Sequence, residues 1–282
     1  MKLGITGAGG QLGGLLTNYA LKNAAASDVV LITRNPDKLA GQAAEVRAGD
    51  FNDPAGLVAA FKGIDKLVMI PTGDLTPGVR TKQQADAIAA AVKAGVKHII
   101  YISTVSPRPS DNVLFDSHFK TEQNLIASGA KWTILRMSIY TDSLMGSVQG
   151  ALASGTYAAI EGAPAAYCTR DDIAAAAAGI LTSDGHEGVT YHATGPASVN
   201  QAGIAAAVGQ ASGKDINFAE ITEADQRKTL ESIGLPPPLI DGIMGFQRGL
   251  RAGAFDLVTH DVERLSGRPA TSVEAFFQKA LG

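Results

Sequence analysis

The sequence predicts an α/β fold: a Rossmann-type doubly wound parallel sheet with a smaller, mostly helical C-terminal lobe. Short, continuously apolar runs alternate with helical stretches through the first half of the chain, which is typical of a parallel sheet covered on both faces. A glycine-rich turn joins the first apolar run to the first helical stretch. The length of 282 residues suits one such sheet with an appended lobe.

The predicted elements of the first half follow from these runs and from the residues that end them. The predicted strands cover residues 2–6, 28–33, 66–70, 97–103 and 131–136. The predicted helices cover residues 12–23, 53–61, 81–94 and 115–128. Gly95 and Gly129 follow two of these helices, as glycine commonly does at a helix end.

The later chain is less regular. Residues 140–168 are rich in Gly, Ser and Ala and predict loops and short helices over the ligand crevice, followed by a helix at 173–181 and a strand at 189–193. Pro236-Pro237-Pro238 interrupts a helical C-terminal lobe. We expect residues 1–138 to form the dinucleotide-binding domain, with 169–195 returning to it. We expect 139–168 and 196–282 to form the smaller substrate-side lobe.

Composition excludes several classes of protein. The net charge of −3, with no basic run, argues against nucleic-acid binding. A single cysteine, Cys168, excludes an internal disulfide framework and favours a reduced, cytoplasmic setting. No signal peptide and no apolar run long enough to span a membrane is expected. The histidines have no metal-ligand spacing, so we expect no metal site.

The glycine-rich turn predicts a dinucleotide site. Gly7, Gly10 and Gly13 have the spacing G-x-x-G-x-x-G between a predicted strand and a predicted helix, with Gln11 and Leu12 at the start of that helix. Such a turn lets the backbone approach a pyrophosphate, and the helix N-terminus adds free N–H groups and a positive dipole end. A simple tight turn is the alternative, but the strand–turn–helix context favours the phosphate turn.

The residue after the second strand indicates which dinucleotide binds. An NAD-specific site has an acidic residue there for the ribose 2′-hydroxyl, whereas this chain has Arg34, which can pair with the 2′-phosphate of NADPH. An ordinary solvated arginine is the alternative. Asp50 and Phe51 lie where the third strand should end and are candidates to border the adenine. A helix cap by Asp50 or Asp53 is the other reading of that segment.

The usual proton donor of short-chain dehydrogenases is missing. None of the six tyrosines is followed four residues later by lysine, so the chain has no Tyr-x-x-x-Lys pair. Two-electron reduction of a quinone tolerates this absence, because the product is a phenolate-like anion whose conjugate acid has a pKa near 10. A simple ketone would give a far more basic alkoxide and would need a positioned acid.

Several motifs together resemble those of the atypical short-chain dehydrogenases of the NmrA-like group, and most of all its branch of quinone and triphenylmethane reductases. The motifs are Thr6-Gly7-Ala8-Gly9-Gly10-Gln11-Leu12-Gly13, Arg34-Asn35-Pro36, His118-x-x-Thr121-Glu122, Leu135-Arg136…Tyr140, Thr169-Arg170-Asp171, Gly185-His186-Glu187-Gly188, Ser212-Gly213-Lys214 and Gly267-Arg268-Pro269. The chain departs from the branch at Gly9, where threonine is usual, and at Met137, where asparagine is usual. Met137 lies where nicotinamide and substrate are expected to meet, which leaves the substrate open.

The resemblance suggests further site residues. His118 lies where related enzymes of the isoflavone-reductase type carry a lysine, and Glu122 is one helical turn away. The histidine either orients the substrate or the nicotinamide or donates a proton, or it forms a pair with Glu122 that only fixes the helix. We expect Tyr140 to form a wall beside the nicotinamide, with core packing as the alternative. Further candidates at strand ends beside the cofactor are Pro71, Thr72, Ser103 and Met137.

The expected function is NADPH-dependent reduction of a quinone or a similar electrophilic conjugated compound. The alternatives are a non-catalytic NADP-binding redox sensor, as found in the NmrA-like group, and reduction of another conjugated acceptor such as a dye or an enone. The expected partner is a small-molecule electrophile, with no nucleic acid and no membrane, and a homodimer is an open possibility.

Overall fold

Seven strands form the central sheet, in the spatial order β3-β2-β1-β4-β5-β6-β8. The computed structural model describes residues 1–282. The strands are β1 (Leu3–Thr6), β2 (Val29–Thr33), β3 (Glu45–Ala48), β4 (Lys66–Met69), β5 (His98–Thr104), β6 (Lys131–Met137) and β8 (Val189–Ala193). All pairings from β3 to β6 are parallel, so the carboxyl ends of these strands meet at one edge of the sheet. The predicted fold class is confirmed.

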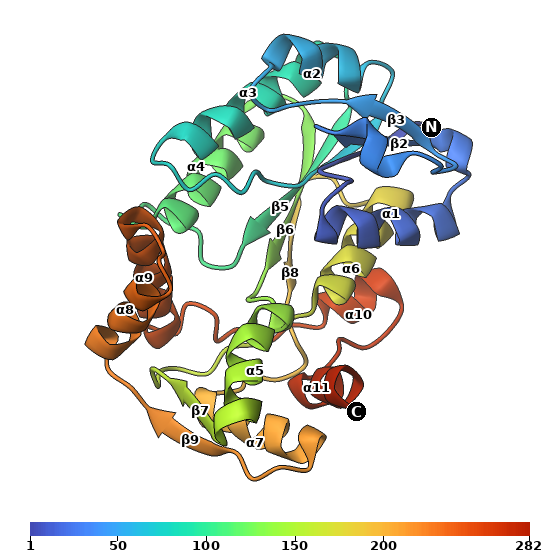
Figure 1. The fold of residues 1–282 in the computed structure, drawn as a ribbon. Helices are drawn as coiled ribbons and strands as arrows, with labels where there is room; N and C mark the ends of the chain where they lie inside the picture. The colour runs from blue at the N-terminus through green and yellow to red at the C-terminus, as the bar shows by residue number, and fades with distance from the viewer. The chain divides into compact units, whose positions relative to one another are not determined.

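Helices cover both faces of this sheet (Figure 1). They are α1 (Gln11–Asn23), α2 (Pro54–Phe61), α3 (Val79–Lys93), α4 (Val113–Ala127), α6 (Arg170–Thr182) and α10 (Asp261–Ser266). Helices α2, α3 and α4 lie on one face, where Leu57, Ile88 and Leu125 join the buried apolar core. Helices α1 and α6 pack against each other on the opposite face. Each fully buried side chain of this size stabilises the fold by about 1.5–3 kcal/mol.

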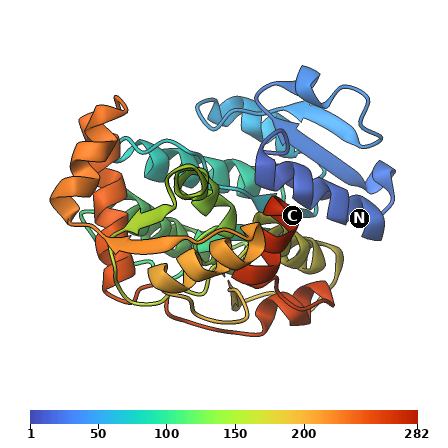
Figure 2. The same cartoon turned by 60° about the horizontal axis from the view of Figure 1, so that its bottom comes forward.

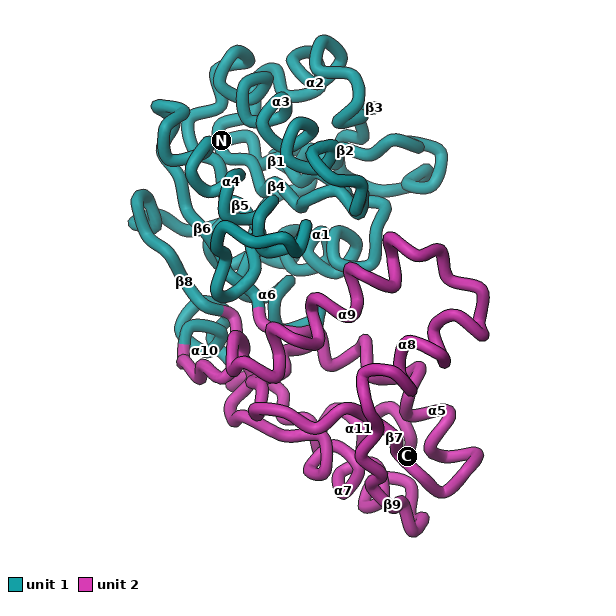
Figure 3. The backbone as a smooth tube through the Cα atoms, turned by 90° about the vertical axis from the view of Figure 1, so that its left-hand side faces the viewer, with its two compact units in different colours: residues 1–137, 170–192, 261–268 teal, residues 138–169, 193–260, 269–282 magenta.

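The chain divides into two compact units (Figure 3). The first contains residues 1–137, 170–192 and 261–268, and the second contains 138–169, 193–260 and 269–282. This division differs from the sequence prediction chiefly at 261–268, which was assigned to the C-terminal lobe. In the structure, α10 from that segment packs on α6 so closely that a Cβ on Gly179 would lie 1.9 Å from the carbonyl oxygen of Leu265.

An ion-pair cluster fixes the same segment within the first unit. Arg268 follows α10 and binds Asp171 at 2.6 Å and Asp172 at 2.7 Å, both in the first turn of α6. The hydroxyl of Tyr19 on α1 donates to Asp171 at 2.9 Å. Residue 268 thereby joins α10 to the two helices that cover one face of the sheet.

The second unit is mostly helical, with a small parallel sheet of two strands, β7 (Thr156–Ala159) and β9 (Asn217–Glu220). Its helices are α5 (Met145–Ser154), α7 (Gln201–Ser212), α8 (Glu223–Ser232), α9 (Pro237–Arg251) and α11 (Val273–Leu281). Helices α7 and α11 pack side by side (Figure 2). The proline run separates α8 from α9, as the sequence predicts: Pro236 is the N-cap residue of α9, and Pro237 and Pro238 begin the helix, where proline lacks only an N–H that would be unpaired.

Cys168 is buried and forms no disulfide. None of the helices combines the length and the apolar character that crossing a membrane requires.

Candidate functional site

The glycine turn after β1 has the geometry expected of a phosphate-binding turn. Gly7 has a φ of +64°, a conformation that favours glycine, and its carbonyl accepts a hydrogen bond from the amide of Gly10 at 2.9 Å. A Cβ on Gly13 would lie 2.1 Å from the carbonyl oxygen of Gly7. No larger residue fits at position 13, so the helix can approach the turn only because glycine is there.

The helix that follows begins without a side-chain cap. Gly10 is the N-cap residue of α1, no side chain binds the first amides, and the first turn contains no acidic residue. Gly7, Gly10 and Gln11 are exposed, whereas Leu12 is buried against the core. Uncapped amides and the positive end of the helix dipole at an exposed position form a binding site for an anion such as a pyrophosphate.

Arg34 lies directly after β2, next to this turn. The amide of Ala8 donates to the carbonyl of Ile32 at 3.2 Å, which ties the glycine turn to the end of β2. The side chain of Arg34 is exposed and makes no hydrogen bond or ion pair with the rest of the chain. Its guanidinium is therefore available to a ligand at the carboxyl edge of the sheet.

The segment after β3 has a different role for each of its predicted residues. Phe51 is 9% exposed and belongs to the core under α2 and α3. Asp50 accepts hydrogen bonds from the amide and side chain of Asn52 at 2.9 and 3.2 Å, which fixes the turn. Asp53, not Asp50, caps α2 through the amide of Gly56 at 3.0 Å. The backbone at 50–52 still lies at the carboxyl edge.

Pro71 and Thr72 follow β4 and are half-buried. The hydroxyl of Thr72 donates to the side-chain oxygen of Gln83 at 2.7 Å, and its carbonyl accepts a hydrogen bond from Arg80. Both contacts come from α3. The helix therefore fixes the position of this segment at the carboxyl edge, beside the turn after β1.

Ser103 and Glu122 belong to a buried cluster between β5, β6 and α4. Ser103 is fully buried and donates to Glu122 at 2.6 Å, so its hydroxyl points toward α4. Arg136 binds the same carboxylate with two N–H groups, at 3.0 and 2.7 Å. Glu122 thus pairs with Arg136, whose fork matches a carboxylate, and its hydrogen bonds go to Arg136 and Ser103. Met137 ends β6 and is half-buried.

His118 is 2% exposed on α4, and both of its ring nitrogens have partners within the protein. Nε2 lies 2.9 Å from Nη2 of Arg80, and Nδ1 lies 2.8 Å from the hydroxyl of Tyr101. Burial, and next the Arg80 guanidinium, hold the pKa of His118 well below its usual range. A neutral imidazole with both nitrogens engaged has no proton to offer a substrate in this arrangement.

Arg80 is the residue of this region that the sequence reasoning missed. It is 5% exposed in the first turn of α3 and contacts both Thr72 and His118. An arginine at the start of a helix looks solvated in a sequence, and only its position in the fold shows it to be buried. A cationic residue following the fourth strand of the sheet was the available signal.

Tyr140 belongs to the second unit. It precedes the 3-10 helix η3 (Thr141–Leu144), is half-buried, and forms an isolated β-bridge with Cys168. Its carbonyl accepts a hydrogen bond from the hydroxyl of Ser143 at 2.6 Å. Its role at the nicotinamide stays a prediction.

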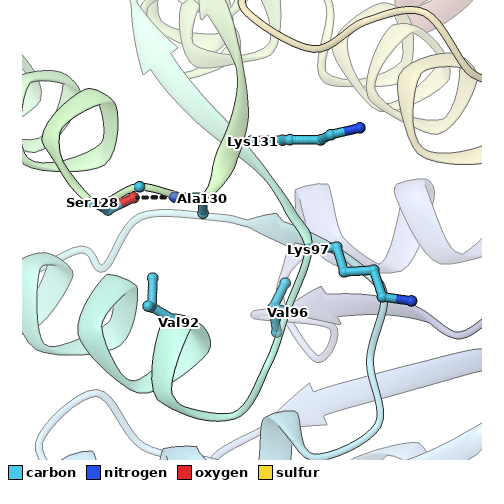
Figure 4. Close-up of a pocket in the computed structure, with 7 residues that line it drawn as sticks. Val92, Val96, Lys97, Ser128, Ala130 and Lys131 are labelled. Atoms are coloured by element: carbon cyan, nitrogen blue, oxygen red, sulfur yellow. Dashed lines mark hydrogen bonds between the residues drawn. The ribbon is translucent and has the colours of Figure 1, made fainter.

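The amino edge of the sheet has a shallow hollow of about 450 Å³ (Figure 4). It is lined by Val92, Val96, Lys97, Ser128, Gly129, Ala130 and Lys131. Lys97 pairs with Asp65 at 2.7 Å and Lys131 with Glu187 at 3.3 Å. The hollow adjoins the start of β5 and β6, so it lies at the end of the strands opposite the glycine turn.

The residues at the carboxyl edge fit a phosphorylated dinucleotide. The uncapped start of α1 suits a pyrophosphate. Gly10 is the N-cap residue, and a Cβ there would lie 3.2 Å from the carbonyl oxygen of Gly7 and would project where the pyrophosphate must approach. Arg34 supplies an unpaired cation for a further phosphate. Among the described residues, no cluster of side chains could hold a metal ion.

Comparison with known proteins shows that the chain is similar to NAD(P)H-binding reductases. A model of an NAD(P)H-binding family matches residues 7–184. Quinone oxidoreductase 2 of Escherichia coli (strain K12) is 36% identical over 275 residues, which is 96% of each chain. The crystal structure of the NADPH-dependent quinone oxidoreductase from Escherichia coli with NADPH matches with a TM-score of 0.92 and 35% identity, over 99% of both chains. The triphenylmethane reductase of Citrobacter sp. with NADP(H) matches with a TM-score of 0.92 and 29% identity over 100% of both chains.

Proposed function

We propose, from the premise that the chain belongs to the NAD(P)H-binding family of atypical short-chain dehydrogenases, that it catalyses the NADPH-dependent two-electron reduction of quinones or similar electrophilic conjugated compounds. The family membership confirms the predicted NmrA-like resemblance and the predicted class of cofactor. The protein is thus an oxidoreductase, and the acceptor is the part that we propose. The observation that carries the proposal is the arrangement at the carboxyl edge of the sheet. The uncapped start of α1 and the unpaired Arg34 suit NADPH, whereas the buried His118 and Tyr101 have no proton to release to a substrate.

The cofactor part of the proposal assigns each residue at the carboxyl edge a task. The amides at the start of α1, beside Gly10 and Gln11, bind the pyrophosphate. Arg34 binds the 2′-phosphate and so favours NADPH over NADH. Thr72 and the backbone after β4 border the ribose, held there by α3.

The chemical part of the proposal needs no side-chain acid. Bound NADPH supplies a hydride, and the quinone becomes a hydroquinone anion that takes one proton from water. The pKa of that conjugate acid is near 10, so protonation at neutral pH is favourable without a catalyst. His118 and Tyr101 are buried and hydrogen-bonded to each other, and burial raises the pKa of Tyr101. Orientation of the acceptor and exclusion of water are then the protein's contribution.

Two relatives support the choice of acceptor. The relative of 36% identity is named a quinone oxidoreductase, and a second relative, from Streptomyces griseus, is named as a reductase of an alkanoyl-oxo-dihydrofuran phosphate and is 29% identical. Both names describe conjugated carbonyl acceptors. The Met137 position, where the branch usually has asparagine, is where we expect this chain's own acceptor preference to arise.

The test is turnover of NADPH with a panel of acceptors. The purified protein is mixed anaerobically with NADPH and 1,4-benzoquinone, a naphthoquinone or cyclohexanone, and the absorbance of NADPH is followed against samples without protein. We expect both quinones to be reduced and cyclohexanone not to be reduced at a comparable rate. Tight binding of NADPH without turnover of any quinone would favour the alternative, a redox sensor. Comparable reduction of cyclohexanone would mean that a side chain donates a proton to the alkoxide product, which would contradict the proposed chemistry.

A further inference from the structure

A closed ring of hydrogen bonds surrounds the start of α3. Nη2 of Arg80 donates to Nε2 of His118 at 2.9 Å, and Nδ1 of His118 donates to the hydroxyl of Tyr101 at 2.8 Å. The hydroxyl of Tyr101 donates to the side-chain oxygen of Gln84 at 2.6 Å. The side-chain amide of Gln84 donates to the carbonyl of Arg80 at 3.2 Å, which closes the ring.

The direction of each bond follows from the chemistry of arginine. A guanidinium has only donors, so Nε2 of His118 must accept and its proton must lie on Nδ1. All four residues are at most 5% exposed. In such surroundings a hydrogen bond is strong and an unpaired polar group is costly, so these bonds hold the four side chains in one arrangement, although Nε of Arg80 has no partner in it. Protonation of His118 would replace the acceptor of Arg80 by a second cation, and it would break the ring.

Arg80 connects the ring to the carboxyl edge of the sheet, and Gln83, also on α3, contacts the same edge. Nη1 of Arg80 donates to the carbonyl of Thr72, and the hydroxyl of Thr72 donates to Gln83 at 2.7 Å. Gln83 in turn donates to the side chain of Asn52 at 2.9 Å. The segments after β4 and after β3 are therefore both held by α3, and both lie at the edge where the glycine turn begins α1.

The segment after β4 depends on these bonds for its order. Residues 70–78 contain no helix or strand, and they connect β4 to α3. Without the Arg80 and Gln83 contacts, this segment would have more conformational freedom in the free protein, and the entropy lost on ordering it would reduce the binding free energy.

We propose that His118 is a positioning residue for NADPH, and that it acts by holding Arg80 on the carbonyl of Thr72. The histidine itself touches neither cofactor nor acceptor. This inference rests on the proposed NADPH site, but it does not depend on which acceptor is reduced. It assigns His118 an effect on cofactor affinity and none on the protonation of the product.

The test measures NADPH affinity separately from turnover. The dissociation constant of NADPH is measured by fluorescence titration without acceptor, and KM for NADPH and kcat are measured with benzoquinone. For His118→Leu, we expect the dissociation constant and KM to rise about tenfold, with kcat at saturating NADPH within about threefold of wild type. For His118→Gln, whose side-chain oxygen can still accept from Arg80, we expect most of the affinity to return. Tyr101→Phe keeps the ring size and removes one bond, so its effect should be smaller, about two- to threefold.

His98→Leu is the matched control, because it removes a buried histidine of the same unit from the amino end of β5. Its NADPH affinity should be that of wild type even if its melting temperature falls.

The inference is overturned if His118→Leu binds NADPH as wild type does, or if His118→Gln loses as much affinity as His118→Leu. It is also overturned if the loss is confined to kcat with a shifted pH profile, since that would identify an acid. If His118→Leu does not fold, Tyr101→Phe and His118→Gln decide, because unchanged affinity in Tyr101→Phe would contradict the ring. Failure of wild type to bind NADPH would refute the proposed function instead.

Discussion

Two buried histidines, His118 on α4 and His98 on β5, differ in what surrounds them. His118 has a partner for each ring nitrogen and lies in the ring that supports the carboxyl edge. His98 is the first residue of β5, at the amino edge. Its Nε2 donates to Thr133 at 2.8 Å, because the hydroxyl of Thr133 itself donates to a carbonyl, and its Nδ1 has no partner.

The cations at the two ends of the sheet also differ, because those at the amino edge have carboxylate partners and Arg34 at the carboxyl edge has none. At the amino edge Lys66, Lys97 and Lys131 are all paired with carboxylates, at 2.8, 2.7 and 3.3 Å. At the carboxyl edge Arg34 is unpaired, although it is at the end of a strand of the same sheet. In the proposed function, charge alone does not distinguish the binding edge; the distinguishing feature is a cation without an internal partner beside uncapped amides.

The comparison is tested most severely at the glycine turn. Gly10→Val places a branched side chain where the pyrophosphate must approach, so NADPH binding should weaken by 100-fold or more. The matched control is Gly14→Ala in the same helix, where a Cβ would meet nothing within 4 Å and affinity should be unchanged. Titration of both folded variants with NADPH measures the difference. Normal binding by a folded Gly10→Val protein would mean that the cofactor does not lie on this turn.

The unpaired cation is tested by cofactor preference. Removal of a charge-assisted hydrogen bond costs about 1.5–3 kcal/mol, so Arg34→Ala should reduce the preference for NADPH over NADH by roughly 10- to 150-fold. Lys97→Ala, at the amino edge, should leave the preference as it is. The ratio of the two dissociation constants is the measurement, and the same ratio in wild type and Arg34→Ala would contradict the 2′-phosphate assignment.

A smaller effect is expected from the second unit. Tyr140→Phe removes a hydroxyl whose role beside the acceptor is a prediction, and we expect kcat with benzoquinone to fall by tenfold or less. General acid catalysis contributes roughly 10²–10⁴-fold, so a loss in that range would make Tyr140 a proton donor. Steady-state rates at saturating NADPH separate the two cases.

The smallest effect concerns the orphaned ring nitrogen of His98. Burial, beside Lys66, Lys131 and His186 and opposed by Glu187, lowers the pKa of His98 from 6.5 to about 4. The unfolded chain therefore binds a proton at His98 between pH 6.5 and 4 that the folded chain does not. The contribution of His98 to the free energy of unfolding is therefore fully present above pH 6.5 and is lost as the pH falls toward 4.

The measurement for His98 is the melting temperature at pH 7 and pH 5. In His98→Leu the fall between these values should be smaller than in wild type by about 2–4 °C. The same pH dependence in both proteins would mean that His98 is protonated or solvated in the folded state.

The fold could be predicted where local sequence determines it. Gly7, Gly10 and Gly13 have a spacing that forces a turn and a helix start, and the strands β1, β4 and β5 are continuous apolar runs. The strands β7 and β9 were not predicted, because each has four residues and no apolar run. Helix α10 was also not assigned, since six residues carry little periodicity.

The site could be predicted in part, and the limit is the direction of side chains. Arg34 follows a strand at a fixed distance from the turn, so its position was available from the sequence. Phe51 and Ser103 were expected to face the cofactor, but their side chains are buried toward helices. The i, i+4 spacing of His118 and Glu122 suggested a pair, whereas the rotamers direct them to Arg80 and Arg136. Such choices depend on contacts between distant segments.

The ion pairs of Arg268 affect the order in which parts of the chain can fold during synthesis. Domains generally fold as units during synthesis, beginning with the N-terminal one. Here the nucleotide-binding unit includes both residues 1–137 and residues 261–268, so α6 lacks its contacts with α10 and Arg268 until residue 268 has left the ribosome. The unit that begins first is therefore among the last to be finished. A nascent chain shorter than about 268 residues should depend on chaperones or on delayed folding to protect the exposed face of α6.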